Sequence, residues 1–387
     1  MIIKPPYGVS PNYDLTIGNA QVDYQALNSI ELCLEENKHD MLKLEMAGLP
    51  PRAVTEYRGL GVRLTFDTGP GYQDEFTGYV TEVKPHSHTS AGLMNNSPFQ
   101  DVTIVCMGAS YDMRGAKSRP WEETTLGDVA RQFAKDYKMS LDVPQTADER
   151  VYRLMLQDSE SDWQFLVRYA GLLGYSVSGH NTHLHIYDPF LAASRQISYN
   201  KLMTSRGSKL DGTAVPGRIS DFKGRFTRRH ADGVFKNSVV TVQQDDGLTY
   251  DVDSREVFRI TTGTAPRLQD NLSHPVETYA EAIRVINRRS REEYDYEATI
   301  EVVGLAGCQP GGVISLDNYA AEFDGLWYVR GVDHRLASGG FVSTLDVARN
   351  VRSELESGTI TERLQSPPQP VWFNNKWQSS KRRYRAY

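Results

Sequence analysis

The sequence predicts a β-rich α+β chain in which two similar β domains flank an α/β module. Alternating apolar and polar residues fill the first 118 positions and return beyond about residue 218. Between these stretches the apolar residues recur at helical spacing. A hairpin pattern that begins at Gly61 recurs at Gly312, and such internal similarity is typical of duplicated domains.

The composition fits a folded chain of two or three domains. Of the 387 residues, 39% are hydrophobic and 24% are charged, which is typical of globular proteins. No apolar stretch reaches about 18 residues, so no spanning helix is predicted. The first residues lack the features of a secretory signal, so we expect the chain to be made and folded in a cytosol. Three widely spaced cysteines, Cys33, Cys106 and Cys308, indicate buried thiols rather than disulfides or a structural zinc site.

Charge is distributed unevenly along the chain. The 43 Lys and Arg residues and 49 Asp and Glu residues give a net charge of −6. Residues 351–387 hold seven basic and three acidic residues, so the rest of the chain, with 36 basic and 46 acidic residues, carries −10. An acidic body repels nucleic acid, which argues against DNA recognition as the main function.

Residues 1–118 are predicted to form the first β domain. Val62, Leu64 and Phe66 alternate with polar residues, and a turn at 68–71 leads to a second strand at 76–83. Residues 84–100 read as a long loop before the next strand. Because loops of this length inside compact domains are usually functional, this loop is a candidate partner contact.

Residues 119–205 are predicted to form the α/β module. One helix follows Thr124 and Thr125 as possible N-caps. After a short strand around 151–156, a second helix follows Ser159 and ends at Gly174. A hairpin with its turn at 179–182 is expected next. The helices have these apolar stripes: Leu126, Val129, Ala130, Phe133, Ala134 and Tyr137 in the first, and Trp163, Leu166, Val167, Ala170 and Leu173 in the second.

Residues 206–350 are predicted to form the second β domain, with strands at 238–243, 257–261 and 298–348 and an inserted helix near 275–291. Residues 351–387 contain a Pro-rich stretch followed by aromatic and basic residues. Such a segment cannot build a core, so we expect an extended arm that orders on a partner.

Several motifs resemble a known family. Residues 156–166, followed by the strand at 182–188, are similar to the middle segment of phage late control D proteins and of type VI secretion spike proteins of the VgrG type. Residues 308–315, 325–334 and 339–344 resemble their second barrel, and Phe76-Thr-Gly-Tyr-Val80 resembles their first. Together these motifs cover roughly residues 55–350 in the family's order.

The resemblance implies two tube-like β-barrel domains with α/β insertion modules, assembled as a homotrimer. Three chains with two barrels each would form a pseudo-sixfold ring, which could adapt a sixfold tail tube to a threefold spike or tail tip. The implied role is a structural baseplate hub in the virion of a phage or in a related injection machine. The implied partners are the tail tube or a distal tail protein and a separate spike or tip protein. DNA would pass the acidic lumen without specific binding.

Candidate catalytic and metal motifs are better explained by local structure. Asp67-Thr-Gly matches the aspartic-protease triplet, but no second copy exists and the triplet also suits a hairpin turn. His180, His183 and His185 could bind Zn²⁺ or Ni²⁺, yet no local Cys or carboxylate completes the set. Acidic residues at 158–162 suit a helix start, and those at 245–253 suit a turn. We therefore predict no cofactor, no metal and no catalytic residue.

Two other functions stay open. A tail-associated cell-wall hydrolase on the same fold would need a catalytic constellation, and a monomeric sugar-binding protein would need exposed aromatics in one cleft. The arm is the predicted partner-binding site, either docking on an acidic subunit or binding nucleic acid. Its candidate residues are Trp372, Trp377, Lys381, Arg382, Arg383 and Arg385.

Overall fold

A computed structural model of the chain describes most of residues 12–187 and parts of the remainder. The described residues are 12–23, 26–49, 56–69, 72–86, 100–148, 150–187, 198–203, 219–226, 237–243, 249–253, 269–271, 282, 296–317, 323, 325–337 and 340–349.

The first strand group follows from strict alternation. Val62, Leu64 and Phe66 are at most 2% exposed, as their period-2 spacing predicted. Lys84 and His86 belong to a strand rather than to the expected loop, and residues 87–99 lie outside the described part. The strands are β1 (Asn12–Ile17), β2 (Ala20–Gln21), β3 (Leu27–Glu35), β4 (Met41–Leu49), β5 (Gly61–Gly69), β6 (Tyr72–His86) and β7 (Gln100–Gly108).

An α/β unit follows, with its own hydrophobic core. Helix α1 (Leu126–Asp136) begins at Thr125 and helix α2 (Asp162–Leu172) begins at Ser161, each with a capping box. Gly174 ends the second helix with φ of 81°. The other elements are η3 (Ala109–Arg114), β8 (Ala116–Thr124), β9 (Ser140–Asp142), η4 (Gln145–Asp148), β10 (Tyr152–Ser161), β11 (Ser176–His180) and β12 (His183–Tyr187).

Three details differ from the sequence-based expectation. The strand expected near 151–156 continues as β10 to Ser161. Its partner β8 spans residue 118, which was the predicted end of the first β domain. The hairpin turn contains only Asn181 and Thr182, because His180 pairs with His183. Asn181 has φ of 54°, which suits a tight two-residue turn.

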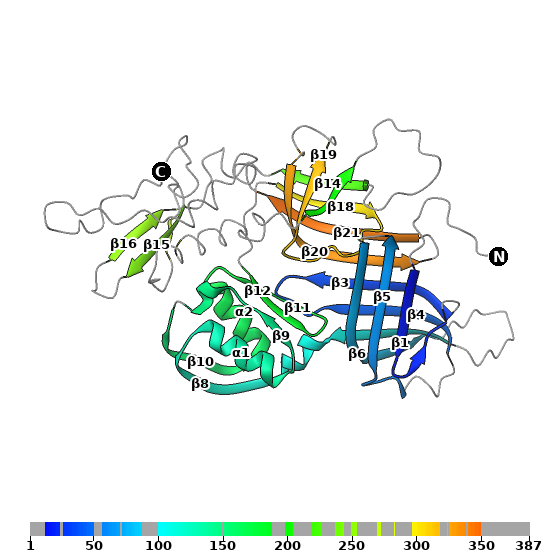
Figure 1. Cartoon of the computed structure of the whole chain (residues 1–387), viewed down its shortest axis with the longest axis horizontal. Helices are drawn as coiled ribbons and strands as arrows, with labels where there is room; N and C mark the ends of the chain where they lie inside the picture. The colour runs from blue at the N-terminus through cyan, green and yellow to red at the C-terminus, as the bar shows by residue number, and fades with distance from the viewer. Residues whose placement is uncertain are drawn as a thin grey trace.

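Strands β14 and β18–β21 of the second group lie above the first group in Figure 1, whereas β15 and β16 lie apart at the left. The strand expected at 257–261 lies outside the described residues. So does the helix near 275–291, except for Ala282, which is helical and buried. The strands are β13 (Ser198–Met203), β14 (Ile219–Phe226), β15 (Asn237–Gln243), β16 (Thr249–Asp253), β17 (Gln269–Asn271), β18 (Tyr296–Val303), β19 (Val313–Asp317), β20 (Gly325–Ala337) and β21 (Gly340–Arg349).

Five strands of each group have the same topology. The spatial order β3-β4-β7-β6-β5 in the first group matches β14-β18-β21-β20-β19 in the second, strand for strand in sequence order. Two of the register shifts coincide as well, whereas those of β4–β7 and β5–β6 have no counterpart in the second group. The register of β6 against β7 shifts at 80–82, and that of β20 against β21 shifts at 329–331. The register of β3 against β4 shifts at 27–29, and that of β14 against β18 shifts at 219–221. Matching order and bulges are what a duplicated unit predicts.

The two groups are joined rather than separate. β20 pairs antiparallel with β3 from Gly331↔Glu35 to Ala337↔Ser29, so one 13-stranded sheet runs through both. One hydrophobic core lies beneath it, with Leu32 and Ile104 from the first group and Leu345 from the second all fully buried. Strands β1, β5 and β6 cross over β3 and β4, which gives the sheet its curled form (Figure 1).

Candidate functional site

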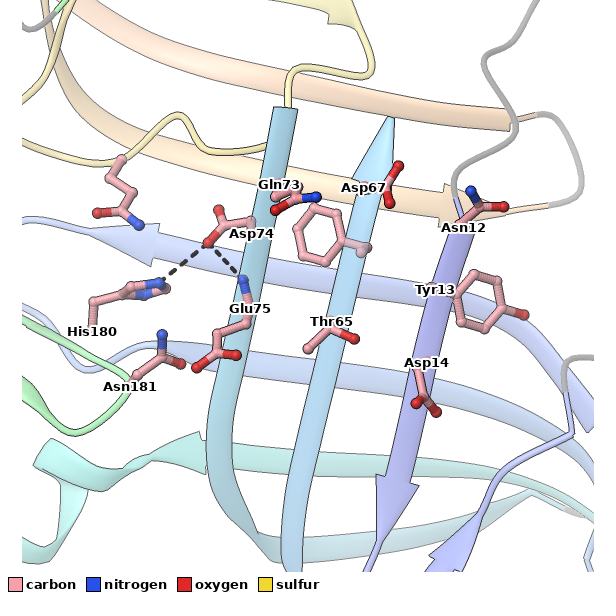
Figure 2. A pocket seen from close by; sticks show the side chains of 12 residues that line it. Asn12, Tyr13, Asp14, Thr65, Asp67, Gln73, Asp74, Glu75, His180 and Asn181 are labelled. Atoms are coloured by element: carbon pink, nitrogen blue, oxygen red, sulfur yellow. Dashed lines mark hydrogen bonds and ion pairs between the residues drawn. The ribbon is translucent and has the colours of Figure 1, made fainter. Parts of the chain in front are cut away.

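The strand groups and the α/β unit meet at a buried cluster of acids and histidines. Asp40 lies between β3 and β4, Asp74 lies on β6, and His180 ends β11. His180 Nδ1 is 2.8 Å from Asp40 Oδ2, and His180 Nε2 is 3.3 Å from Asp74 Oδ1. Figure 2 shows His180 directed at the carboxylate of Asp74. We call His180, Asp40, Asp74 and His334 the junction cluster.

A neighbouring turn positions His180. Asn37, with φ of 62°, donates its backbone N–H to the Val177 carbonyl at 2.7 Å, and its side-chain oxygen accepts from the Val177 N–H at 3.0 Å. The Asn37 carbonyl also accepts from Trp163 Nε1 at 3.2 Å. These bonds hold β11 and α2 against the turn between β3 and β4, and they therefore fix the position of His180 at the end of β11.

The second strand group completes the cluster through His334 on β20. Its Nε2 is 3.7 Å from Asp74 Oδ2, and its Nδ1 is 2.8 Å from Ser343 Oγ on β21. Ser343 Oγ also accepts from the Leu305 N–H at 3.0 Å. The side chains of His334, Asp74 and Asp40 are at most 5% exposed. One carboxylate therefore contacts a histidine from each of two other parts of the chain.

The geometry favours a charged His180. Burial disfavours its cation, but hydrogen bonds to Asp40 and Asp74 outweigh burial and raise its pKa to about 10. Burial also opposes ionisation of Asp74, yet the hydrogen bond from His180 and the nearby His334 lower the pKa of that carboxyl. For Asp40, burial outweighs the hydrogen bond from His180 and raises the pKa, and the charge of Asp74 adds a smaller contribution in the same direction. His180 at neutral pH is thus a cation held between carboxylates, which suits a structural tie rather than proton transfer.

An open pocket of about 610 Å³ lies beside the cluster (Figure 2). Its lining joins β1, β5 and β6 to the β11–β12 turn and to Gln309. Glu75 is paired with Arg63 at 3.1 Å, and Asp14 accepts from Gln21 at 3.2 Å. The acidic lining residues are Asp14, Asp67, Asp74 and Glu75.

The three histidines considered for metal binding have different partners. His180 faces the two buried carboxylates, His183 Nδ1 is 2.7 Å from Ser140 Oγ, and His185 Nε2 is 3.3 Å from Asp142 Oδ2. Among the described residues, no group of three or more His, Cys, Asp or Glu side chains has a metal-binding arrangement. The structure therefore does not bring these histidines together as a ligand set.

The predicted partner-binding residues lie outside the described residues. These are Trp372, Trp377, Lys381, Arg382, Arg383 and Arg385.

Sequence reasoning missed the junction cluster, since Asp40 and His180 are 140 positions apart. The only local signal was an acidic residue, Asp74, two positions before the buried Phe76. None of the helices in the described part of the chain has the length and hydropathy needed to cross a membrane.

Solved structures with a similar fold come from phage tails and secretion machines. A 43 kDa tail protein of prophage MuSo2 from Shewanella oneidensis has a TM-score of 0.60 and 15% identity, covering 88% of this chain and 98% of that one. The tail protein from Neisseria meningitidis MC58 has a TM-score of 0.60 and 14% identity, covering 89% and 97%. The E. coli c3393 protein, a component of the type VI secretion system, has a TM-score of 0.54 and 11% identity, covering 87% and 77%.

These likenesses confirm the expected relation to tail and secretion-spike proteins at the level of the fold. No curated relative matches the sequence. A family model described as "Alg8 N-terminal domain" matches residues 88–338, which is more than half of the 387 residues. The chain therefore belongs to the Alg8 N-terminal domain family.

Proposed function

We propose that the chain is the structural hub of a phage tail baseplate or of a related injection machine. Three copies would form a pseudo-sixfold ring that adapts a sixfold tail tube to a threefold spike or tail tip. The observation that carries this proposal is the repeat, because five strands of each group share one order and two bulge positions. A chain with two equivalent units is what a threefold ring needs to imitate six subunits.

The pairing of β20 with β3 suggests how neighbouring chains would meet. In the repeat, β6 corresponds to β20 and β14 corresponds to β3. Among the described residues, β14 pairs only with β18. Strand β6 pairs with β5 as far as Tyr79, and from Val80 onward it pairs only with β7 among the described strands. The open β6 edge of one copy could therefore meet the β14 edge of the next, as β20 meets β3 within the chain.

The polar face of the shared sheet suits a lumen for DNA or other cargo. On the side away from the core, alternate positions of β3, β4, β18, β20 and β21 carry more carboxylates than cations. Arg330 is shared by Glu297 and Asp346, at 3.1 and 2.8 Å. Like-charge repulsion would then keep DNA from binding as it passes. The charged residues of this face are Glu31, Glu35, Lys43, Glu45, Glu297, Glu301, Arg330, Asp333, Arg335 and Asp346.

The ring is tested by crosslinking at the predicted contact. His86 and Lys223 occupy the register positions of Arg335 and Glu31, which are Cα partners between β20 and β3. A His86→Cys/Lys223→Cys variant treated with a short bismaleimide should give covalent species of up to three times the 43.6 kDa chain mass. The native thiols should react little, because burial raises the pKa of Cys33, Cys106 and Cys308 to about 12.

A His86→Cys/Leu172→Cys pair is the matched control, since Leu172 is 40% exposed but lies on α2. This pair should give no series of crosslinked products that ends at the trimer. Equal series from both pairs, or products that stop at dimers, would contradict the ring. Native mass measurement, alone and with purified tail proteins, gives the oligomeric state without crosslinking.

The arm at 351–387 is proposed to strengthen assembly in the virion. Its seven basic residues and its tryptophans suit contacts with an acidic neighbour, such as the tail tube, a distal tail protein, the spike or another copy. Truncation at Ser353 should leave the circular dichroism spectrum unchanged but lower the yield of assembled tails. Normal tail yield from the truncated chain would count against this role.

A further inference from the structure

An apolar surface covers the outer face of the β8–β10 ribbon. Leu154 and Leu156 on β10 are 55% and 52% exposed, and Val151 just before the strand is 54% exposed. These are three of the five exposed large hydrophobic residues among the described residues, and all three lie within residues 151–156. In Figure 1 the ribbon forms the outer rim of the α/β unit, beyond α1 and α2. We call this surface the ribbon face.

Strand β10 is apolar on both sides. Met155, between the two exposed leucines, is fully buried against the helices, so the inner face is already used. Strands that are apolar on both faces are typical of sheets covered on both sides. β8 and β10 form a sheet of only two strands in the described part of the chain. The outer leucines therefore require a cover from elsewhere.

The ribbon also carries more exposed carboxylates than cations, since Glu122, Glu123 and Asp158 are exposed against Arg153. Glu122 is the Cα partner of Leu154, and Pro120 is that of Leu156. Glu122 is exposed and makes no ion pair with any described residue. The basic residues of the same strand, Lys117 and Arg119, turn inward to the buried Asp162. A partner with apolar and basic side chains would complement this face.

We propose that the C-terminal segment 372–385 of this chain is the occupant of the ribbon face. It combines large aromatic side chains, including Trp372 and Trp377, with the basic run at 381–385. The exposed leucines would pack against the aromatic rings, and the carboxylates would form ion pairs with the guanidinium groups. Between Arg349, the last described residue, and Trp377 the chain can span up to about 90 Å, so the segment can reach this face on its own copy or on a neighbour.

The docking site rests on the role proposed above for the arm but not on the ring, so the two tests fail separately. A photocrosslinking residue, p-benzoylphenylalanine, is placed at Leu156 in the full chain. After illumination, mass spectrometry should identify crosslinks to peptides within 366–387. The same residue at Leu172, which is exposed on another element, should give at least fivefold less of these products.

Charge reversal tests the second half of the complementarity. An Arg382→Glu/Arg383→Glu variant should lower the crosslink yield from position 156 at least fivefold, and 0.5 M salt should lower it in the parent. As a readout without the photoprobe, Leu154→Ser/Leu156→Ser should speed proteolysis of the arm about tenfold relative to Leu172→Ser. Crosslinks from position 156 to other parts of the chain, or to another tail protein, would overturn the assignment. So would arm proteolysis that is equal in both serine variants.

Discussion

His180 keeps its proton because carboxylates face it from two separate places. Asp40 precedes β4 and Asp74 lies on β6, and both are almost fully buried. A buried cation is costly unless it is paired and hydrogen-bonded. The pairing therefore determines where the β11–β12 hairpin can sit, and it ties the α/β unit to the sheet.

Replacement of His180 should destabilise the protein in a pH-dependent way. Because the folded pKa is about 10, above the ordinary value of 6.5, its stabilising effect is fully present below about pH 6.5. It declines as the pH rises and is lost as the pH passes 10. His180→Gln should lower the free energy of unfolding by about 3 kcal/mol at pH 6.5, and by much less at pH 10.

Urea titrations of both proteins at pH 6.5, 8 and 10 measure this difference. His183→Gln is the control, since His183 is exposed on the same hairpin and its ring nitrogen lies 2.7 Å from the Ser140 hydroxyl rather than beside a buried carboxylate. A stability loss for His180→Gln that is the same at all three pH values would show that charge is not the cause.

Sequence reasoning could not have found this cluster. The hairpin that contains His180, His183 and His185 was predicted from the sequence, and β11 and β12 confirm its strands. The partners of His180 are Asp40 and Asp74, which lie more than 100 positions away in the sequence, so no local pattern indicates them. Metal binding was an open possibility because the sequence contains the ligand types but not their distances.

At the scale of elements, periodicity was the reliable signal. Both helices begin at capping residues and bury most of the stripes that their spacing predicted, although Val167 and Tyr137 are only half-buried and Tyr137 follows the end of its helix. Their caps and apolar stripes are local, so the sequence carries them directly. Strand β8 was missed because Ala116–Thr124 alternates polar residues with partly buried cations, whose inward direction comes from Asp162.

The close approach of β7 explains why the Phe-Thr-Gly-Tyr motif of β6 contains a glycine at position 78. An added Cβ would lie 2.2 Å from the Met107 carbonyl oxygen on β7 and 2.7 Å from the Phe76 ring. Gly78→Ala should therefore push β7 away and lower the free energy of unfolding by about 3 kcal/mol. Gly61→Ala is the matched control, because a Cβ there meets nothing within 4 Å.

Thermal unfolding monitored by circular dichroism separates these two variants. The midpoint should fall clearly for Gly78→Ala and stay close to that of the parent for Gly61→Ala. Equal midpoints would mean that β6 and β7 can move apart without cost.

At the scale of the molecule, the sequence predicted two similar β units but not their joining. The Gly61 and Gly312 patterns correspond to β5–β6 and β19–β20, which occupy equivalent places in the two strand orders. The pairing of β20 with β3 leaves no local trace, because it links positions about 300 residues apart. The assignment of residues 1–118 and 206–350 to separate domains stays a prediction.

The shared sheet predicts that both strand groups unfold together, whereas the α/β unit has a separate core. Leu32 on β3 is fully buried, and its neighbours are Leu42 on β4 and His334 on β20. Leu32→Ala should cost about 3 kcal/mol and should speed amide exchange in β4 and also in β18 and β21. Leu166→Ala, in the core of the α/β unit, should speed exchange mainly in α1 and α2. Hydrogen exchange read by mass spectrometry compares the two variants. If Leu32→Ala changed exchange in the first strand group alone, the two groups would be independent folding units despite the pairing of β20 with β3.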